Sequence, residues 1–260
     1  MFEVFDQTAS SPRAIISIPH SGLEIPATFE NCLTPEKRER DRDVDLGVPE
    51  LIDIQRLNQK NCVVLVAKVH RICVDLNRPE KESIFNWKQN SFGKQLVLKE
   101  FNESSRLEFC KKYYCPYYTK LQELFKKHGP ALPMIDLHSM PSRATDYHLK
   151  KNPKQKVDRP DFCISDFHSR SAPPDRAQFM KAQLESCGYQ ALVNDPYFGG
   201  NITQYFSQFC NQVIQLEIKR GLYMDENKGV LVPELVQKLK EKLTACILSY
   251  FAEFGQKTAP

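Results

Sequence analysis

Short apolar runs separated by polar stretches recur along the chain, and several have the length of a strand. Unbroken apolar runs are typical of strands buried on both faces of a sheet, and CVVLVAKV at 62–69 is the clearest one. The predicted strands are 14–18, 62–69, 72–76, 132–137, 161–165, 189–193 and 211–218.

Apolar residues spaced three to four apart predict amphipathic helices between these strands. One such stretch runs from Leu107 to Phe125 and contains Pro116. We expect this proline to kink or split the helix, because it lacks a backbone N–H and clashes with the preceding turn. Other helices are predicted over 48–59, 177–187 and 233–254, and loops over 80–104 and 150–160.

The alternation of strands and helices indicates an α/β fold with a mostly parallel sheet covered by helices. A length of 260 residues allows one large domain or two small ones, and no convincing linker divides the sequence. In open sheets of this kind, binding sites form at the carboxyl ends of the strands. The residues that follow the predicted strands are therefore the first candidates for chemistry.

Composition and charge narrow the possible functions. The chain has 41% apolar and 26% charged residues, and its net charge of +4 is too weak to indicate a nucleic acid or a membrane surface as partner. The N-terminus lacks the features of a secretory signal, and no apolar run approaches the length of a membrane span. We expect a soluble, cytoplasmic protein. Its nine cysteines contain no CxxC pair and are expected to be reduced and mostly buried.

Histidines and carboxylates gather at the predicted strand ends. His20 and His138 each follow a strand, and three aspartates lie within 41–45. A lone histidine in such a place is more often a structural residue than a ligand. Two imidazoles and one carboxylate, however, are a common protein ligand set of catalytic zinc, which keeps a further position open for water.

Two further polar groups complete this pattern. Glu217 lies within an apolar strand, where a carboxylate is costly unless it is paired or functional, and it could take a proton from water. Asn77 and Arg78 follow the strand at 72–76, and a guanidinium offers a planar fork for a substrate carboxylate. The set predicts a metal-dependent hydrolase.

The order of these motifs resembles the N-formylglutamate amidohydrolase family, also called N-formylglutamate deformylases. Single pieces such as PHSG carry little information, whereas the ordered set closed by LYMDE is specific. The matching pieces are IPHSG (18–22), DVDLG (43–47), DLNRP (75–79), YYCPYYTKL (113–121), IDLHSMPS (135–142), ISDFHSRSA (164–172), NDPYFGGNIT (194–203) and QLEIKRGLYMDE (215–226).

The resemblance implies one catalytic domain over residues 1–260. Its fold would be a three-layer α/β/α arrangement with a mixed, mostly parallel sheet, distantly related to zinc carboxypeptidases and aspartoacylases. The implied substrate is a small acidic N-acyl amino acid. The most specific expectation is that N-formyl-L-glutamate and water give formate and L-glutamate, a late step of histidine breakdown. The implied cofactor is one divalent ion, expected to be Zn²⁺.

The resemblance also implies the metal ligands. His20 and His138 match the two imidazole ligands, and Asp45, which precedes the Leu-Gly pair, matches the carboxylate ligand. Zinc carboxypeptidases place a glutamate where this chain has Leu23. Glu24 and Asp43 therefore stay open as alternatives for the third ligand.

The resemblance also assigns roles to Glu217, Asn77 and Arg78, and the expected mechanism suggests roles for three further residues. Glu217 is expected to act as general base and acid, and Asn77 with Arg78 to bind a substrate carboxylate. Arg143, in the loop after His138, is a candidate donor to the tetrahedral oxyanion. Gly200 allows a close backbone approach in the GGNIT loop, and Tyr197 could line the pocket. Because Arg78 is expected to bind a substrate carboxylate, neutral amides should be poor substrates.

Two departures from the family pattern leave other functions open. Tyr118 and Gly47 stand where family members often carry histidines. Because pocket walls set specificity, a related zinc deacylase or carboxypeptidase-like amidase, acting on another N-acyl amino acid or peptide, is one alternative. A homologue that binds metal or ligand without catalysis is another, although Glu217 argues against it.

Overall fold

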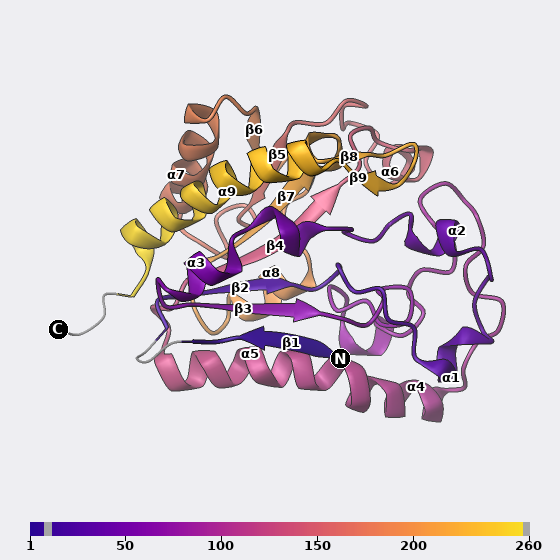
Figure 1. Cartoon of the computed structure of the whole chain (residues 1–260). Helices are drawn as coiled ribbons and strands as arrows, with labels where there is room; N and C mark the ends of the chain where they lie inside the picture. Colours follow the sequence, from indigo (N-terminus) through magenta and orange to yellow (C-terminus); the bar gives the residue numbers. More distant parts are fainter. Residues whose placement is uncertain (8–11, 257–260) are drawn as a thin grey trace.

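A seven-stranded mixed sheet lies at the centre of the computed structural model, which describes residues 1–7 and 12–256 (Figure 1). Its strands are β1 (Phe2–Phe5), β2 (Ala14–Ile18), β3 (Cys62–Ala67), β4 (Met134–Met140), β5 (Phe162–Ser165), β6 (Ala191–Val193) and β7 (Val213–Lys219). They are ordered β1-β3-β2-β4-β7-β5-β6. The four central strands β3, β2, β4 and β7 are parallel, whereas β1 is antiparallel to β3 and β5 is antiparallel to β7. The sheet is therefore mixed and mostly parallel, as predicted.

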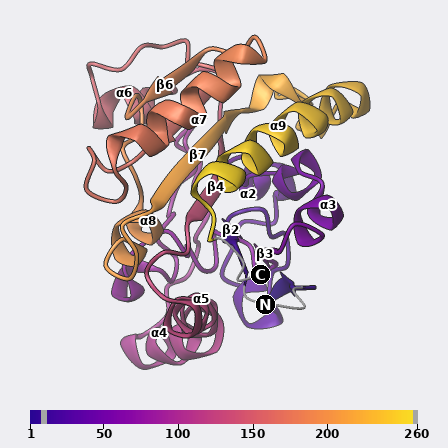
Figure 2. The same cartoon turned by 90° about the vertical axis from the view of Figure 1, so that its left-hand side faces the viewer.

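Helices cover both faces of this sheet (Figure 2). The α-helices are α1 (Ala27–Glu30), α2 (Lys37–Asp41), α3 (Ile54–Asn58), α4 (Glu103–Phe109), α5 (Cys115–His128), α6 (Asp146–Lys151), α7 (Pro174–Ser186), α8 (Asn201–Phe206) and α9 (Pro233–Phe254). One apolar core joins the sheet to α3, α7 and α9, and a second core joins its other face to α5 and α8. This is the predicted three-layer α/β/α arrangement.

The alternation of side chains along β4 separates core from chemistry. Ile135 and Leu137 belong to the core beneath α7 and α9. Asp136 and His138 point to the opposite face, because successive residues of a strand face opposite sides. Asp136 accepts a hydrogen bond there from Ser17 Oγ of β2, and this hydroxyl also contacts the Tyr117 hydroxyl of α5. The face toward α5 and α8 thus carries polar groups.

Two predicted elements are wrong. The segment 72–76 forms turns instead of a strand, with hydrogen bonds from the N–H groups of Cys73 and Val74 to the His70 carbonyl. The segment 48–59 is a 3-10 turn, Val48–Leu51, followed by the short helix α3. Ile52 between them has an extended backbone, which ends the first turn, and Asp53 accepts a hydrogen bond from the Arg56 N–H to begin the second helix.

The predicted break at Pro116 is confirmed in a specific form. The helix changes to a π-helical turn over Cys110–Tyr114, and α5 begins at Cys115 with the proline in its first turn. A proline in the first turn needs no N–H partner, so its cost falls on the preceding turn. Other short elements are the 3-10 turns Glu80–Glu82 and Arg220–Leu222, and a hairpin of β8 (Met224–Asp225) and β9 (Val230–Leu231).

Several short elements escape the sequence prediction, namely β1, β8, β9, α1, α2, α6 and α8. The nine cysteines are free thiols, and seven of them are buried. Among residues 1–7 and 12–256, no helix combines the length and apolar character needed to cross a bilayer.

Candidate metal centre and active site

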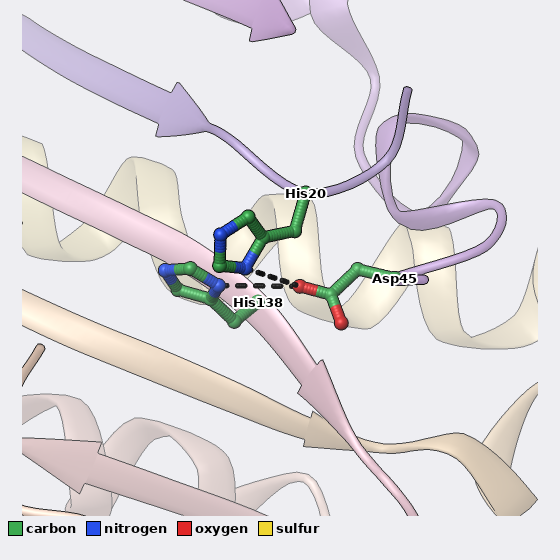
Figure 3. Close-up of side chains that lie close together, drawn as sticks. All are labelled: His20, Asp45 and His138. Atoms are coloured by element: carbon green, nitrogen blue, oxygen red, sulfur yellow. Dashed lines mark hydrogen bonds and ion pairs between the residues drawn. The ribbon is translucent and has the colours of Figure 1, made fainter. Parts of the chain in front are cut away.

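Three predicted metal ligands come together at the carboxyl end of the parallel strands (Figure 3). His20 lies two residues after β2, and His138 lies within the adjacent strand β4. Asp45 comes from the loop that leads to the 3-10 turn, and its N–H donates to the His20 carbonyl at 3.0 Å. This backbone bond places the aspartate directly against the histidine segment.

The donor atoms of this group converge. One ligand atom from each of His20, Asp45 and His138 lies within 4.8 Å of the other two, and all three residues are buried. His138 Nδ1 is 3.2 Å from Asp45 Oδ2, and His20 Nδ1 is 3.8 Å from the same oxygen. In Figure 3 both imidazoles turn the same ring nitrogen toward the carboxylate. In the part of the chain that the structure describes, these are the residues grouped closely enough to hold a metal ion.

A second carboxylate holds the far side of each imidazole. Asp75 Oδ1 lies 2.8 Å from His20 Nε2, and Asp136 Oδ2 lies 2.9 Å from His138 Nε2. An ionised carboxylate only accepts hydrogen bonds, so each Nε2 carries a proton, and a ring without a second proton directs its Nδ1 lone pair toward Asp45. Sequence reasoning missed both outer aspartates. Asp136 could have been found from its spacing, because residues two apart in a strand share a face.

Asp45 is held in its ionised form. Ser139 Oγ and Arg220 Nη2 donate to its other oxygen at 3.0 and 3.3 Å. Burial opposes ionisation, yet the hydrogen bond and charge of His138 hold the pKa of Asp45 well below its usual range. Arg220 itself is buried and also donates to Ser139 Oγ and to the Arg42 carbonyl, so its guanidinium is well satisfied.

The two histidines have opposite electrostatic surroundings. Burial, with a contribution from Arg71, lowers the pKa of His20 to about 4, although Asp75 opposes this shift. Burial also disfavours the charged form of His138, but the charge of Asp136 and its hydrogen bond raise the pKa of this ring well above its usual value. The His20 imidazole is therefore uncharged over the whole physiological pH range and can offer its Nδ1 lone pair to a metal ion.

Glu217 lies beside this group on the neighbouring strand. It is paired in register with His138 across β4 and β7, so both side chains lie on one face of the sheet. Burial raises its pKa to about 7, and Gln215 Nε2 donates to its Oε1 at 2.8 Å. A carboxyl group with such a pKa can both accept and donate a proton near neutral pH.

The predicted substrate-binding residues occupy two sides of this group. Asn77 Oδ1 accepts a hydrogen bond from the Ile202 N–H at the start of α8, and a Cβ at Gly200 would lie 2.2 Å from Asn77 Nδ2. Only glycine therefore allows this contact. Arg78 Nε donates to Asn86 Oδ1 at 3.2 Å, and the Tyr197 ring lies on the other side, near Glu217.

Three other predicted candidates lie outside the ligand group. The Glu24 side chain is 64% exposed and faces the N-terminal amine. Asp43 accepts hydrogen bonds from the N–H and the hydroxyl of Ser91. Arg143 is 69% exposed, pairs with Asp158 and lines an open cleft beside the site. The geometry favours Asp45 over its two rivals, and it places Arg143 outside the buried ligand group.

Two other arginines and a tryptophan belong to this region and were not singled out from the sequence. Arg71 donates to the Asp43 carbonyl and to Asp75, and its guanidinium lies over the Trp87 ring. Trp87 Nε1 donates to Asp75. Arg159 lies near Glu217 and Tyr197. Arg71 lies four residues before Asp75, whereas Arg159 is distant in the sequence from Tyr197 and Glu217, so only the fold reveals its contacts.

An open cleft of about 1570 Å³ borders the site. Its lining includes Val44 and Leu46, which flank Asp45, together with Arg220, Trp87 and Tyr147. The ring of Trp87, in the loop after the 3-10 turn Glu80–Glu82, lies 5.7 Å from the ring of Tyr147 in α6. The segment 80–104 thus forms one wall of the approach to the buried group.

Comparison with known proteins assigns a family to this arrangement. The sequence pattern of the N-formylglutamate amidohydrolases matches residues 13–224, which is most of the chain. The chain belongs to the N-formylglutamate amidohydrolase family.

Curated relatives support this membership. The N-formylglutamate deformylase of Pseudomonas putida is 26% identical over 264 residues, which cover 94% of this chain and 95% of the relative. The N-formylglutamate deformylase of Pseudomonas aeruginosa is 27% identical over 229 residues, 82% of each chain.

Solved structures share the fold of this N-formylglutamate amidohydrolase family member. The N-formylglutamate amidohydrolase of Ralstonia eutropha JMP134 superposes with a TM-score of 0.83 at 20% identity, covering 97% of this chain and 98% of its own. A gene product of Agrobacterium tumefaciens gives 0.67 at 18% identity, with 95% and 94% covered.

The two departures from the family pattern have structural roles. The Tyr118 hydroxyl donates to the Leu76 carbonyl at 2.8 Å and accepts a hydrogen bond from Asn201 Nδ2, so it ties the Asn77 segment to α8. Gly47 has a φ of 73° and packs against Leu231, where a Cβ would come within 2.6 Å of the leucine side chain. Both residues shape the surroundings of the site.

Proposed function

We propose that this chain hydrolyses the formamide bond of N-formyl-L-glutamate, giving formate and L-glutamate. The observation that carries the proposal is the convergence of His20, Asp45 and His138 beside Glu217 in a member of the N-formylglutamate amidohydrolase family. The two deformylase relatives align over 94% and 82% of this chain.

The donor set fits a divalent ion, which we propose to be Zn²⁺. Two Nδ1 lone pairs and a carboxylate oxygen converge with no proton between them when both rings are neutral, an arrangement that a cation stabilises. Asp75 and Asp136 fix the two rings in the required orientation, as outer carboxylates commonly do for ligating histidines. A zinc ion bound by such a set supplies Lewis acidity, which activates water and polarises a carbonyl group.

Glu217 handles the proton in this proposal. Its carboxylate accepts the proton of the attacking water and returns it to the nitrogen of the leaving L-glutamate, because an amine leaves far more readily than its anion. Gln215 holds one carboxylate oxygen by its 2.8 Å hydrogen bond, which leaves the other oxygen for this transfer. Burial on the face shared with His138 keeps the group close to the reacting atoms.

Arg78 and Asn77 bind a carboxylate of the acidic substrate in this proposal. Asn77 is fixed by the backbone of α8, and Arg78 by Asn86 and by the Asn77 carbonyl. These contacts hold the guanidinium in one orientation, so less side-chain entropy is lost on binding.

The test compares acyl groups and one variant. The purified chain, with its metal content measured, is given N-formyl-, N-acetyl- and N-succinyl-L-glutamate, and the released acid is quantified. We expect formate release to dominate. Glu217→Gln keeps size and hydrogen bonding but cannot accept the proton, so we expect kcat to fall by about 10²–10⁴-fold while metal content stays the same.

Two results would contradict the proposal. Removal of another acyl group without formate release would assign a different substrate. A Glu217→Gln variant with undiminished kcat would remove Glu217 from the proton transfer. Lys156→Gln, at an exposed position of the loop before β5, serves as a control and should leave kcat and metal content unchanged.

A further inference from the structure

Arg159 reaches the site from the antiparallel part of the sheet. Because β5 runs antiparallel to β7, the segment that precedes β5 lies at the edge where β4 and β7 end. The Lys219 N–H donates to the Asp161 carbonyl at 2.9 Å, which holds this segment beside β7. The Arg159 N–H donates to the Ser142 carbonyl at 3.1 Å, which ties it to the loop after β4.

The Arg159 guanidinium is buried without enough partners. Only 3% of the residue is exposed, yet Nε and Nη1 have no hydrogen-bond partner among the residues described. Nη2 donates to Gln155 Oε1 at 3.3 Å, and the group lies 5.0 Å from the centre of the Tyr197 ring. Its positive charge also acts on the Glu217 carboxyl. Burial raises the pKa of Glu217, and the charge of Arg159 opposes this rise. A buried cation with free N–H groups is costly and is stabilised by an anion that binds there.

Arg220 shows that burial alone does not leave an arginine unpaired in this fold. It is 7% exposed, and its guanidinium donates to Asp45, to Ser139 and to the Arg42 carbonyl. Within the described part of the chain, Arg71 in the same region leaves Nε alone without a partner, whereas Arg159 leaves both Nε and Nη1 without one. The Arg159 guanidinium lies against the Tyr197 ring, and its charge acts on Glu217 in the region of the proposed substrate site.

We propose that Arg159 binds one of the two carboxylates of the substrate and so selects N-formyl derivatives of dicarboxylic amino acids. This inference rests on the proposed function. Arg78 lies in the segment after β3, and Arg159 lies in the segment before β5. In the sheet, β4 with His138 and β7 with Glu217 stand between β3 and β5. A dicarboxylate can meet a guanidinium on each side while its amide lies at Glu217. The planar fork of arginine suits a carboxylate, which accepts two N–H groups.

The experiment measures selectivity between substrates. Wild type, Arg159→Met, Arg159→Lys and the exposed control Lys156→Met are assayed with N-formyl-L-glutamate and with its two monoamides, N-formyl-L-glutamine and N-formyl-L-isoglutamine. In wild type, the monoamide that lacks the carboxylate bound by Arg159 should lose about 10- to 100-fold in kcat/KM. In Arg159→Met this penalty should vanish, because the acidic substrate loses the same factor. Lys156→Met should keep the wild-type ratios.

Stability separates this role from a structural one. Arg159→Met removes a buried unpaired charge, so its Tm should not fall below that of wild type. If the Arg159→Met variant fails to fold, Arg159→Lys is used instead. It keeps the charge without the planar guanidinium and should lose part of the selectivity. An equal loss of kcat/KM on all three substrates, in either variant, would overturn the proposal and would fit a donor to the oxyanion.

Glutarate binding keeps the inference separate from the proposed function. Glutarate has two carboxylates and no amide bond, so calorimetry reports binding without turnover. The Kd of glutarate should rise about 10- to 100-fold in Arg159→Met. Butyrate has a single carboxylate, and its Kd should be unchanged in Arg159→Met if Arg78 alone holds that carboxylate. Glutarate binding that depends on Arg159, without formate release in wild type, would reject the proposed function and keep the inference. Formate release with unchanged selectivity would reject the inference alone.

Discussion

At the scale of single residues, the chemistry of this site depends on pairs that the sequence separates. His20 and Asp75 are 55 residues apart and share a 2.8 Å contact, whereas His138 and Asp136 are two apart. The residues that carry a visible chemical signature, His20, His138 and Glu217, could be predicted because they follow or interrupt apolar strands. Asp75 could not be assigned its contact with His20, because nothing in the local pattern around it names a distant partner.

Asp136→Asn tests the outer carboxylate. The amide keeps the shape but loses the charge that orients the His138 ring and raises its basicity. We expect the metal Kd to rise about 10- to 100-fold, as is common when such partners are lost. Competition with a chromophoric chelator measures this change. Asp158→Asn, at an exposed position, is the control, and an unchanged Kd in Asp136→Asn would assign the aspartate to folding alone.

At the scale of elements, apolar patterning predicted the parallel centre of the sheet and the long helices. This prediction failed where side-chain contacts or turns determine the backbone conformation in place of the apolar spacing. The run ICVDL at 72–76 is apolar enough for a strand, but its backbone turns to place Asp75 beneath His20 and Asn77 against α8. Edge strand β1 escaped because a single antiparallel neighbour, β3, suffices to hold a short segment.

The long helix α9 allows a stability test of one buried group. The Tyr250 hydroxyl is buried and has no hydrogen-bond partner within the described ranges, whereas the Tyr117 hydroxyl in α5 bonds to Ser17 at 2.9 Å. Tyr250→Phe should therefore raise the free energy of unfolding by about 1 kcal/mol, because it removes an unsatisfied polar group. Tyr117→Phe should lower it by about 1 kcal/mol. Denaturant unfolding with unchanged m-values measures both, and a loss of stability in Tyr250→Phe would contradict this account.

At the scale of the whole molecule, a net charge of +4 hides a local excess of acid. Asp45, Asp75, Asp136 and Glu217 are all buried around two histidines, and they come from segments spread over most of the chain. Composition could not reveal this concentration, because the remaining charges lie mostly on the surface and nearly cancel. The fold gathers the acids at one edge of the sheet, where the proposed divalent cation would balance them.

A bound ion should consequently stabilise the fold as a whole. Its proposed ligands lie at residues 20, 45 and 138, so the bound state would link three separate segments. At a free concentration 100 times the Kd, Zn²⁺ should add about 2.7 kcal/mol to the free energy of unfolding. For a chain of this size the corresponding rise in Tm is about 5–10 °C. Thermal unfolding with excess EDTA and with buffered zinc measures the difference. His138→Ala loses one ligand and should show little zinc-dependent rise, because the two remaining donors bind weakly, whereas a full rise in this variant would place the ion elsewhere.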